Sequence, residues 1–347
     1  MTIMESQLYD ESSYNPFARL VRLNERMLQV GFQQIPLVEL NLLAMADAYL
    51  RGQWLGGGGA ERPLRSFGTE RGIVPLTRVS GAAVPIKPRR AAEFARALGE
   101  LAVRHSGGPE AVRQHAEYAR ALDVPLWMAR RTAPGPHGPV TVTVDRLTTR
   151  VDVWSERAPL VRLRAPAGLS LHRKNPTRGL AITIGDQHAQ LVVDTRGLFS
   201  PKVVTLRTDD QEWLLCMRNG HSSELLRNKQ RVAVITKPPR SRGPRPLLPL
   251  AEVSYGPGQP VDQVVAHALA VSFGIGRHAG TVRFSDSPHQ HLSATHRWEQ
   301  PWFTGVGSCG GDSGPGAGGD GWGGGDGGGD GGGGDGGGGG DGGGGGG

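Results

Sequence analysis

The clearest pattern in the chain is an alternation of apolar and polar residues that begins at Val140. Val140, Val142 and Val144 alternate with polar residues, which places the three valines on one face of a strand. Similar short runs, separated by turn residues, follow at Val151–Trp154, Leu160–Leu163, Leu180–Ile184, Gln190–Asp194, Val203–Thr208, Glu212–Met217, Arg231–Thr236 and Glu252–Tyr255. Asn219-Gly220 predicts a tight hairpin with positive φ angles. The pattern therefore predicts an antiparallel meander that forms a barrel or a sandwich.

One strongly apolar helix is predicted after these strands, at Val261–Phe273. Apolar side chains cover most of its circumference, so we expect it to be buried against the sheet. Its 13 residues are fewer than the roughly 20 needed to cross a bilayer. Strands followed by one apolar helix resemble the tubby-like and scramblase-type barrels, and that resemblance implies a sheet that encloses the helix.

The region before the strands shows helical spacing of apolar residues. Asn15-Pro16-Phe17 is typical of a helix start, and we expect a helix from there to about Gln29. Further helices are predicted at Leu37–Arg51, Arg89–Arg104 and Pro109–Leu122. The fold-class prediction is therefore α+β: an N-terminal helical region, then an antiparallel β meander with one buried helix.

Composition divides the chain further. Residues 305–347 hold 30 of the 55 glycines and six aspartates, and a segment of this composition is expected to be disordered. The predicted organisation is a helical region at 1–131, a Pro/Gly linker at 132–139, a β domain at 140–285, a polar linker at 286–304 and the Gly/Asp tail.

Charge separates the tail from the rest of the chain. Without the tail, 26 acidic residues face 39 basic ones, a net charge of +13. Such a basic surface favours nucleic acid, an anionic membrane or an acidic protein as partner, although a GC-rich coding bias towards arginine is the better explanation of the composition.

Residues 117–131 loosely resemble a DNA-binding helix-turn-helix. Ala119 and Leu122 fit the first helix, and Asp123 stands at the turn, where glycine is usual. The contacts to nucleic acid would come from a small set of arginines: Arg113, Arg120, Arg130 and Arg131. The alternative is a plain helical hairpin whose second helix docks through Trp127, because apolar residues occupy the positions that would contact bases.

Two further clusters could bind ions. Lys237, Arg240, Arg242 and Arg245 form a basic, proline-rich loop that could contact phosphates or anionic lipid. His289, His291 and His296 have a spacing that could hold zinc or nickel. For both clusters the alternative is a solvated connector.

These observations favour a non-enzymatic binding or interaction protein with no cofactor. A DNA-binding regulator, an enzyme whose site comes from distant residues and an anionic-lipid-associated barrel are the alternatives. The N-terminus lacks the apolar stretch of a secretory signal, so we expect a cytoplasmic protein.

Overall fold

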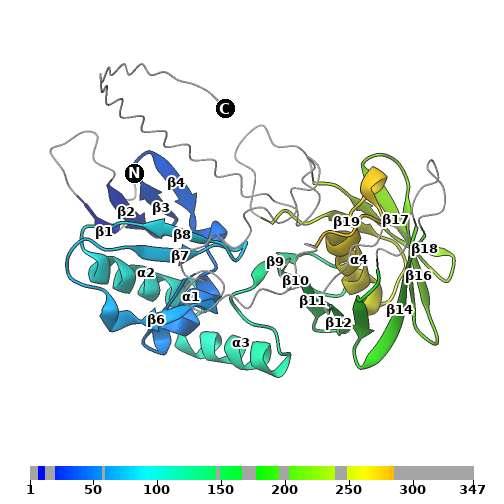
Figure 1. Cartoon of the computed structure of the whole chain (residues 1–347), viewed down its shortest axis with the longest axis horizontal. Coiled ribbons are helices and arrows are strands. Elements are labelled where there is room, and N and C mark those ends of the chain that lie inside the picture. Colours follow the sequence, from blue (N-terminus) through cyan, green and yellow to red (C-terminus); the bar gives the residue numbers. More distant parts are fainter. Residues whose placement is uncertain are drawn as a thin grey trace, which may run out of the picture.

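The computed structural model describes residues 7–11, 20–56, 59–145, 149–165, 177–194, 203–238 and 248–284. In these ranges the protein is mostly antiparallel β-structure, with 19 strands and four α-helices (Figure 1). The helices lie in the middle of the chain and later. The prediction of an N-terminal helical region is therefore wrong. The first elements are strands: β1 (Gln7–Asp10), β2 (Val21–Asn24), β3 (Met27–Val30) and β4 (Gln33–Pro36). The expected helix start at 15–17, the polar linker and the Gly/Asp tail lie outside the described residues.

The predicted first helix is replaced by β2 and β3 from residue 21 onward. Val21 and Leu23 are buried whereas Arg22 is exposed, which is the two-residue period of a strand. The Asn24 side chain closes the β2–β3 turn, since its Oδ1 accepts hydrogen bonds from the backbone N–H groups of Arg26 and Met27 at 2.9 and 2.8 Å. This side-chain turn allows the chain to reverse within a stretch whose apolar residues also fit a helical period.

The predicted second helix is shorter than expected. A 3₁₀ turn, η1 (Leu37–Glu39), comes first, and α1 (Leu42–Leu50) starts only after Asn41, whose side chain accepts a hydrogen bond from the N–H of Ala44. Two hairpins and two helices follow: β5 (Gln53–Leu55), β6 (Glu61–Pro63), η3 (Leu64–Ser66), β7 (Val74–Thr77), β8 (Ala83–Ile86), α2 (Ala91–His105) and α3 (Pro109–Ala121). The helices expected at Arg89–Arg104 and Pro109–Leu122 are thus confirmed.

Helices α1 and α2 pack closely at Gly99. A Cβ atom at this position would lie 2.3 Å from the ring of Tyr49 on α1, so only glycine fits without a shift of the ring. The helices and small sheets of this region enclose one apolar core that includes Leu23, Trp54 and Phe94. Glycine in the middle of α2 is therefore explained by packing rather than by a break in the helix.

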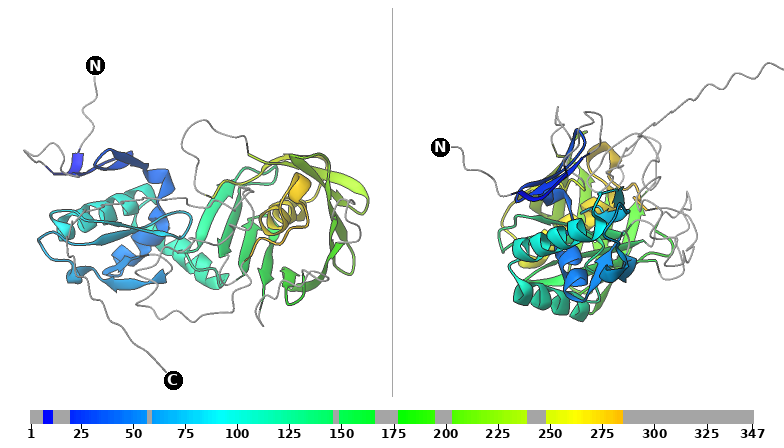
Figure 2. Two further views of the ribbon diagram at one scale, coloured as in Figure 1. Left: turned by 45° about the horizontal axis from the view of Figure 1, so that its top comes forward. Right: turned by 90° about the vertical axis from the view of Figure 1, so that its left-hand side faces the viewer.

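The second half of the chain is dominated by an 11-stranded sheet whose strands follow one another in chain order. Figures 1 and 2 show this sheet curving around helix α4 (Pro260–Phe273). The strands are β9 (Ala129–Ala133), β10 (Val140–Asp145), β11 (Arg150–Ser155), β12 (Ala158–Arg164), β13 (Ala181–Ile184), β14 (Gln187–Asp194), β15 (Val203–Arg207), β16 (Glu212–Met217), β17 (Ser222–Arg227), β18 (Gln230–Thr236) and β19 (Glu252–Tyr255). A short 3₁₀ turn, η4 (Gly276–His278), follows the helix.

The turns of this sheet differ from expectation at one point. Asn219-Gly220 does join two strands, but neither residue has a positive φ. Instead the Asn219 side chain accepts the backbone N–H groups of His221 and Ser222 at 2.9 and 2.8 Å. The turn with two positive φ angles lies one hairpin later, at Asn228 (48°) and Lys229 (69°).

Helix α4 is buried along almost its whole length, as its apolar circumference predicts. Three of its polar residues, Asp262, Gln263 and His267, have partners in the sheet, whereas the buried hydroxyl of Ser272 makes no hydrogen bond with any described residue. Asp262 accepts the indole N–H of Trp213 at 2.9 Å and forms an ion pair with Arg227 at 3.0 Å, and Gln263 donates to Ser155 at 2.9 Å. His267 lies 3.1 Å from the Tyr255 hydroxyl. Within the described ranges, no helix combines the length and apolar character needed to cross a membrane.

Candidate anion-binding site

The outer face of strands β9–β12 carries an unusual row of charged and polar residues. The valines at 140, 142, 144, 151 and 153 turn towards α4 and leave the intervening side chains on the opposite face. Strand pairing aligns Arg130, Thr143, Asp152 and Arg162 in one row across the four strands. Thr143 and Asp152, in the middle of this row, are fully buried.

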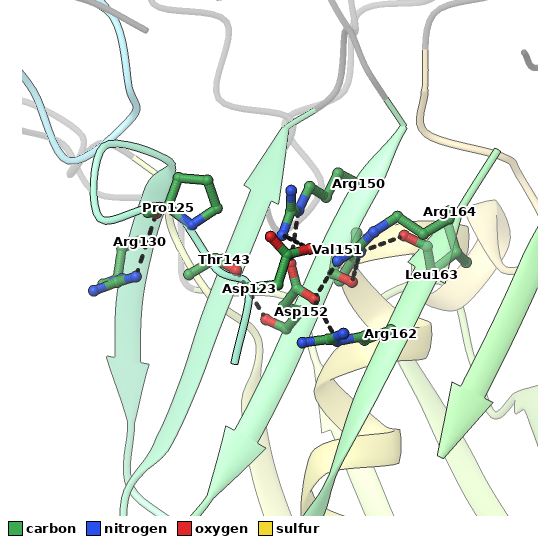
Figure 3. Close-up of polar contacts among 10 residues, drawn as sticks. All are labelled: Asp123, Pro125, Arg130, Thr143, Arg150, Val151, Asp152, Arg162, Leu163 and Arg164. Atoms are coloured by element: carbon green, nitrogen blue, oxygen red, sulfur yellow. Dashed lines mark hydrogen bonds and ion pairs between the residues drawn. The ribbon is translucent and has the colours of Figure 1, made fainter. Parts of the chain in front are cut away.

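Three arginines gather on the buried carboxylate of Asp152 (Figure 3). The closest nitrogens lie 2.6 Å away for Arg164, 3.2 Å for Arg150 and 3.5 Å for Arg162. One carboxylate therefore faces three guanidinium groups, and the cluster carries a surplus of positive charge. Asp123, which is exposed, adds a weaker contact to Arg150 at 3.4 Å.

Arg164 is held more firmly than its neighbours in this cluster. Besides Asp152, its guanidinium donates to the carbonyl oxygens of Val151 and Leu163, each at 3.0 Å. Burial lowers the pKa of Arg164, while Asp152 partly offsets this shift. By contrast, the buried Nε of Arg162 makes no hydrogen bond.

Arg130 belongs to the same row, but its guanidinium lies apart from the group around Asp152 (Figure 3). Within the described part of the chain, no carboxylate is in ion-pairing contact with Arg130, and its buried Nε has no hydrogen-bond partner. Its Nη2 reaches the carbonyl of Pro125 at 3.5 Å, and the guanidinium lies 5.5 Å from the centre of the Trp154 ring. Burial lowers the pKa of Arg130 to about 10, and the charge of Asp152 opposes this shift.

Arg130 points to the space between the sheet and the N-terminal half. A groove of about 670 Å³ lies there, between α3 and the outer face of β9–β11. We call it the α3 groove; besides Arg130 it is lined by Gln114, His115, Tyr118, Thr132, Thr141, Trp154 and Glu156, among others. A second hollow of about 790 Å³ begins at η1 and α1 and shares Leu43, His115 and Arg130 with the α3 groove. Its other walls include Glu25, His105 and Val79.

The chain matches no protein-family model, no curated protein and no solved structure. The function is therefore inferred from the geometry of this site.

The arginines predicted from the helix-turn-helix pattern have separate environments. The expected turn is present, and Asp123 has the positive φ (50°) that its place requires. The second helix is absent: the chain enters β9, so Arg130 and Arg131 lie on a strand rather than at the end of a recognition helix. Arg131 forms an ion pair with Glu39 at 2.8 Å.

On α3, the two remaining predicted arginines are exposed. Arg113 pairs with Glu110 at 2.6 Å, one turn earlier on the same helix, and Arg120 lies near the helix end. Neither side chain lines the α3 groove. Of the four arginines, Arg130 is thus the one that this site contains.

The other predicted ion-binding residues fall mostly outside the described residues. These are Arg240, Arg242 and Arg245 of the basic loop and all three histidines, His289, His291 and His296. Lys237 follows β18, and its backbone N–H donates to the carbonyl of His221 at 3.0 Å. Among the residues that the structure describes, no three His, Cys, Asp or Glu side chains gather as a metal site requires.

Sequence reasoning missed Asp152 and Trp154 as site residues. A signal was present, because Arg150, Asp152 and Trp154 alternate with two valines and must share the face opposite the core. Arg162 and Arg164 repeat the pattern on the next strand. Charged residues at alternate positions of two successive strands are thus a sequence signal of a charge cluster on the polar face.

Proposed function

We propose that the protein is a non-enzymatic binding protein that takes up an anionic ligand in the α3 groove, with Arg130 as the residue that holds the negative charge. The observation that supports this most directly is the state of Arg130: a partly buried guanidinium with a buried, unpaired Nε that lines both hollows. A charge placed in this way destabilises the fold unless a counter-charge is bound. An anion bound in the groove would supply this counter-charge.

Several neighbouring groups suit such a ligand, whereas Glu156, which also lines the groove, does not. Gln114, Thr132 and Thr141 add amide and hydroxyl donors along the same groove. Nδ1 of His115 lies 2.7 Å from the carbonyl of Ala111 and donates its hydrogen there, so the other nitrogen of the neutral ring adds no donor for an anion. The surplus of arginine charge around Asp152, on the adjoining part of the same sheet face, favours an anion further.

A small ligand fits this site better than a duplex. The groove volume lies within the roughly 300–1,000 Å³ typical of small-molecule pockets. The strand at 129–133 takes the place of the helix that would have entered a DNA major groove. Arg131, paired with Glu39, is already neutralised within the protein.

The proposal is tested by calorimetric titration of the full chain with inorganic pyrophosphate at physiological ionic strength, in wild type and two variants. Arg130→Met keeps an unbranched, apolar side chain and removes the charge. Arg113→Met is the matched control, since it removes an exposed arginine of α3 outside the groove.

We expect Arg130→Met to weaken binding at least about tenfold, as loss of a hydrogen bond to a charged group does, and Arg113→Met to leave it unchanged. Equal affinities in all three proteins, or no binding by wild type, would overturn the proposal. A loss of binding in the Arg113 variant alone would shift the site to the exposed face of α3.

A further inference from the structure

The α3 groove has aromatic side chains on both of its walls. Tyr118 stands on α3 and leaves 48 % of its surface exposed, while Trp154 stands on β11 and is half-buried. The other inward residues of α3 are small or aliphatic: Val112, Ala116 and Ala119. Tyr118 is therefore not required to fill the core behind the helix, and its ring remains available to the groove.

Trp154 has an equally specific position. On the outer face of the sheet it pairs with Thr141 of β10, and the Arg130 guanidinium lies over its ring. The charge that would hold an anion thus lies within cation–π range of an aromatic surface. Arginine and tryptophan arranged in this way provide a flat platform beside a positive charge, which suits a ligand with a planar ring next to its negative group.

From these positions we infer that the ligand of the α3 groove is a planar aromatic anion, such as an aryl or heteroaryl phosphate ester, with its anionic group at Arg130 and its ring between Tyr118 and Trp154. This inference rests on the proposed function and specifies its ligand. Polar groups at the groove wall, Thr132 and Thr141, would meet the edge of the ring or the ester oxygens.

Phenyl phosphate and ethyl phosphate are the matched probes, because they carry the same charge and differ in the aromatic ring. The full chain is labelled with 5-fluorotryptophan, and each phosphate is titrated while the ¹⁹F spectrum is recorded. Trp154→Phe assigns the signal of this residue among the seven tryptophans of the chain.

Binding of phenyl phosphate should shift the Trp154 signal and be about three- to tenfold tighter than that of ethyl phosphate, the range expected for one or two aromatic contacts. Tyr118→Leu, at a partly exposed helix position that the fold tolerates, should abolish this preference and leave the affinity for ethyl phosphate unchanged. Phe32→Leu is the matched control: Phe32 is 98 % exposed between β3 and β4 and should not affect either affinity.

The possible outcomes distinguish failure of the aromatic-ligand inference from failure of the proposed anion site. Equal affinity for the two phosphates, with both lost in Arg130→Met, would overturn the aromatic ligand and retain the anion site. A preference that survives Tyr118→Leu and Trp154→Leu would also overturn it, because the ring would then bind elsewhere. Failure of both phosphates to bind wild type would overturn the inference and the proposed function together.

Discussion

Acidification should destabilise the protein through His267, the histidine on the buried helix α4. This side chain is 2 % exposed, and burial lowers its pKa from about 6.5 to about 4. Its ring lies 3.1 Å from the hydroxyl of Tyr255 on β19, and burial likewise raises the pKa of that phenol. The folded protein therefore keeps His267 neutral at pH values where the unfolded chain binds a proton.

The sign and size of the effect follow from this difference. Well above pH 6.5, His267 is neutral in both the folded and the unfolded state, and the stability that depends on its neutral form is fully present. As the pH falls from 6.5 to 4, only the unfolded state gains the proton, so the free energy of unfolding decreases. The loss amounts to about 2 kcal/mol at pH 5 and approaches roughly 3 kcal/mol below pH 4, where the folded state also protonates.

Urea denaturation at pH 8, 6.5 and 5 measures this loss. His267→Gln is the informative variant, because an amide can keep the contact with Tyr255 and does not titrate. Between pH 8 and pH 5 the variant should lose about 2 kcal/mol less than wild type, since carboxylates contribute equally to both proteins. His188→Gln, on the exposed side of β14, should keep the wild-type loss. Identical losses in wild type and His267→Gln would refute the reasoning.

Three further substitutions test the packing described above. Asp152→Asn should lower the free energy of unfolding by about 3 kcal/mol or more in urea, because it removes the buried carboxylate that three partly buried arginines share. Asp123→Asn, at the exposed edge of the cluster, should change it by less than about 0.5 kcal/mol, and similar losses in both variants would contradict the central role of Asp152. Gly99→Ala should lower the melting temperature, since a clash with Tyr49 costing about 1–3 kcal/mol outweighs the better helix propensity of alanine, and a raised melting temperature would refute that close approach. Arg130→Met should leave the melting temperature of the ligand-free protein unchanged or higher, and a clear decrease would show that this guanidinium stabilises the fold.

The strands of the large sheet were predictable because their inner positions are apolar at every second residue, as at Val140, Val142 and Val144. Strand β17 was missed for the opposite reason. Ser222 and Ser223 are both buried, and the hydroxyl of Ser223 accepts the backbone N–H of Gly276 at 2.9 Å. Two adjacent buried serines, one of them hydrogen-bonded to a neighbouring turn, break the apolar alternation by which such a strand is detected.

The N-terminal error has a different physical cause. Apolar residues at 20, 21, 23, 27 and 28 fit a helix as well as a hairpin, and the turn of the hairpin is closed by one side chain, that of Asn24. At the site, the cluster on Asp152 was within reach of sequence reasoning because its members alternate along two successive strands. The position of Arg130 in a groove was not predictable from the sequence, because it depends on how α3 packs over the sheet. No sequence pattern links these two segments.

The polar residues of α4 explain how a helix with apolar groups on most faces takes one orientation inside the sheet. Hydrophobic burial changes little when such a helix rotates or slides, so it specifies position weakly. Three residues bind different parts of the sheet. Asp262 contacts β16 and β17, Gln263 contacts β11, and His267 contacts β19. A rotation would leave several buried polar groups unpaired at once, at a cost of about 1–3 kcal/mol each. Because the partner of Gln263 is Ser155, which also lines the α3 groove, the same contacts that orient the helix hold the wall on which Trp154 stands.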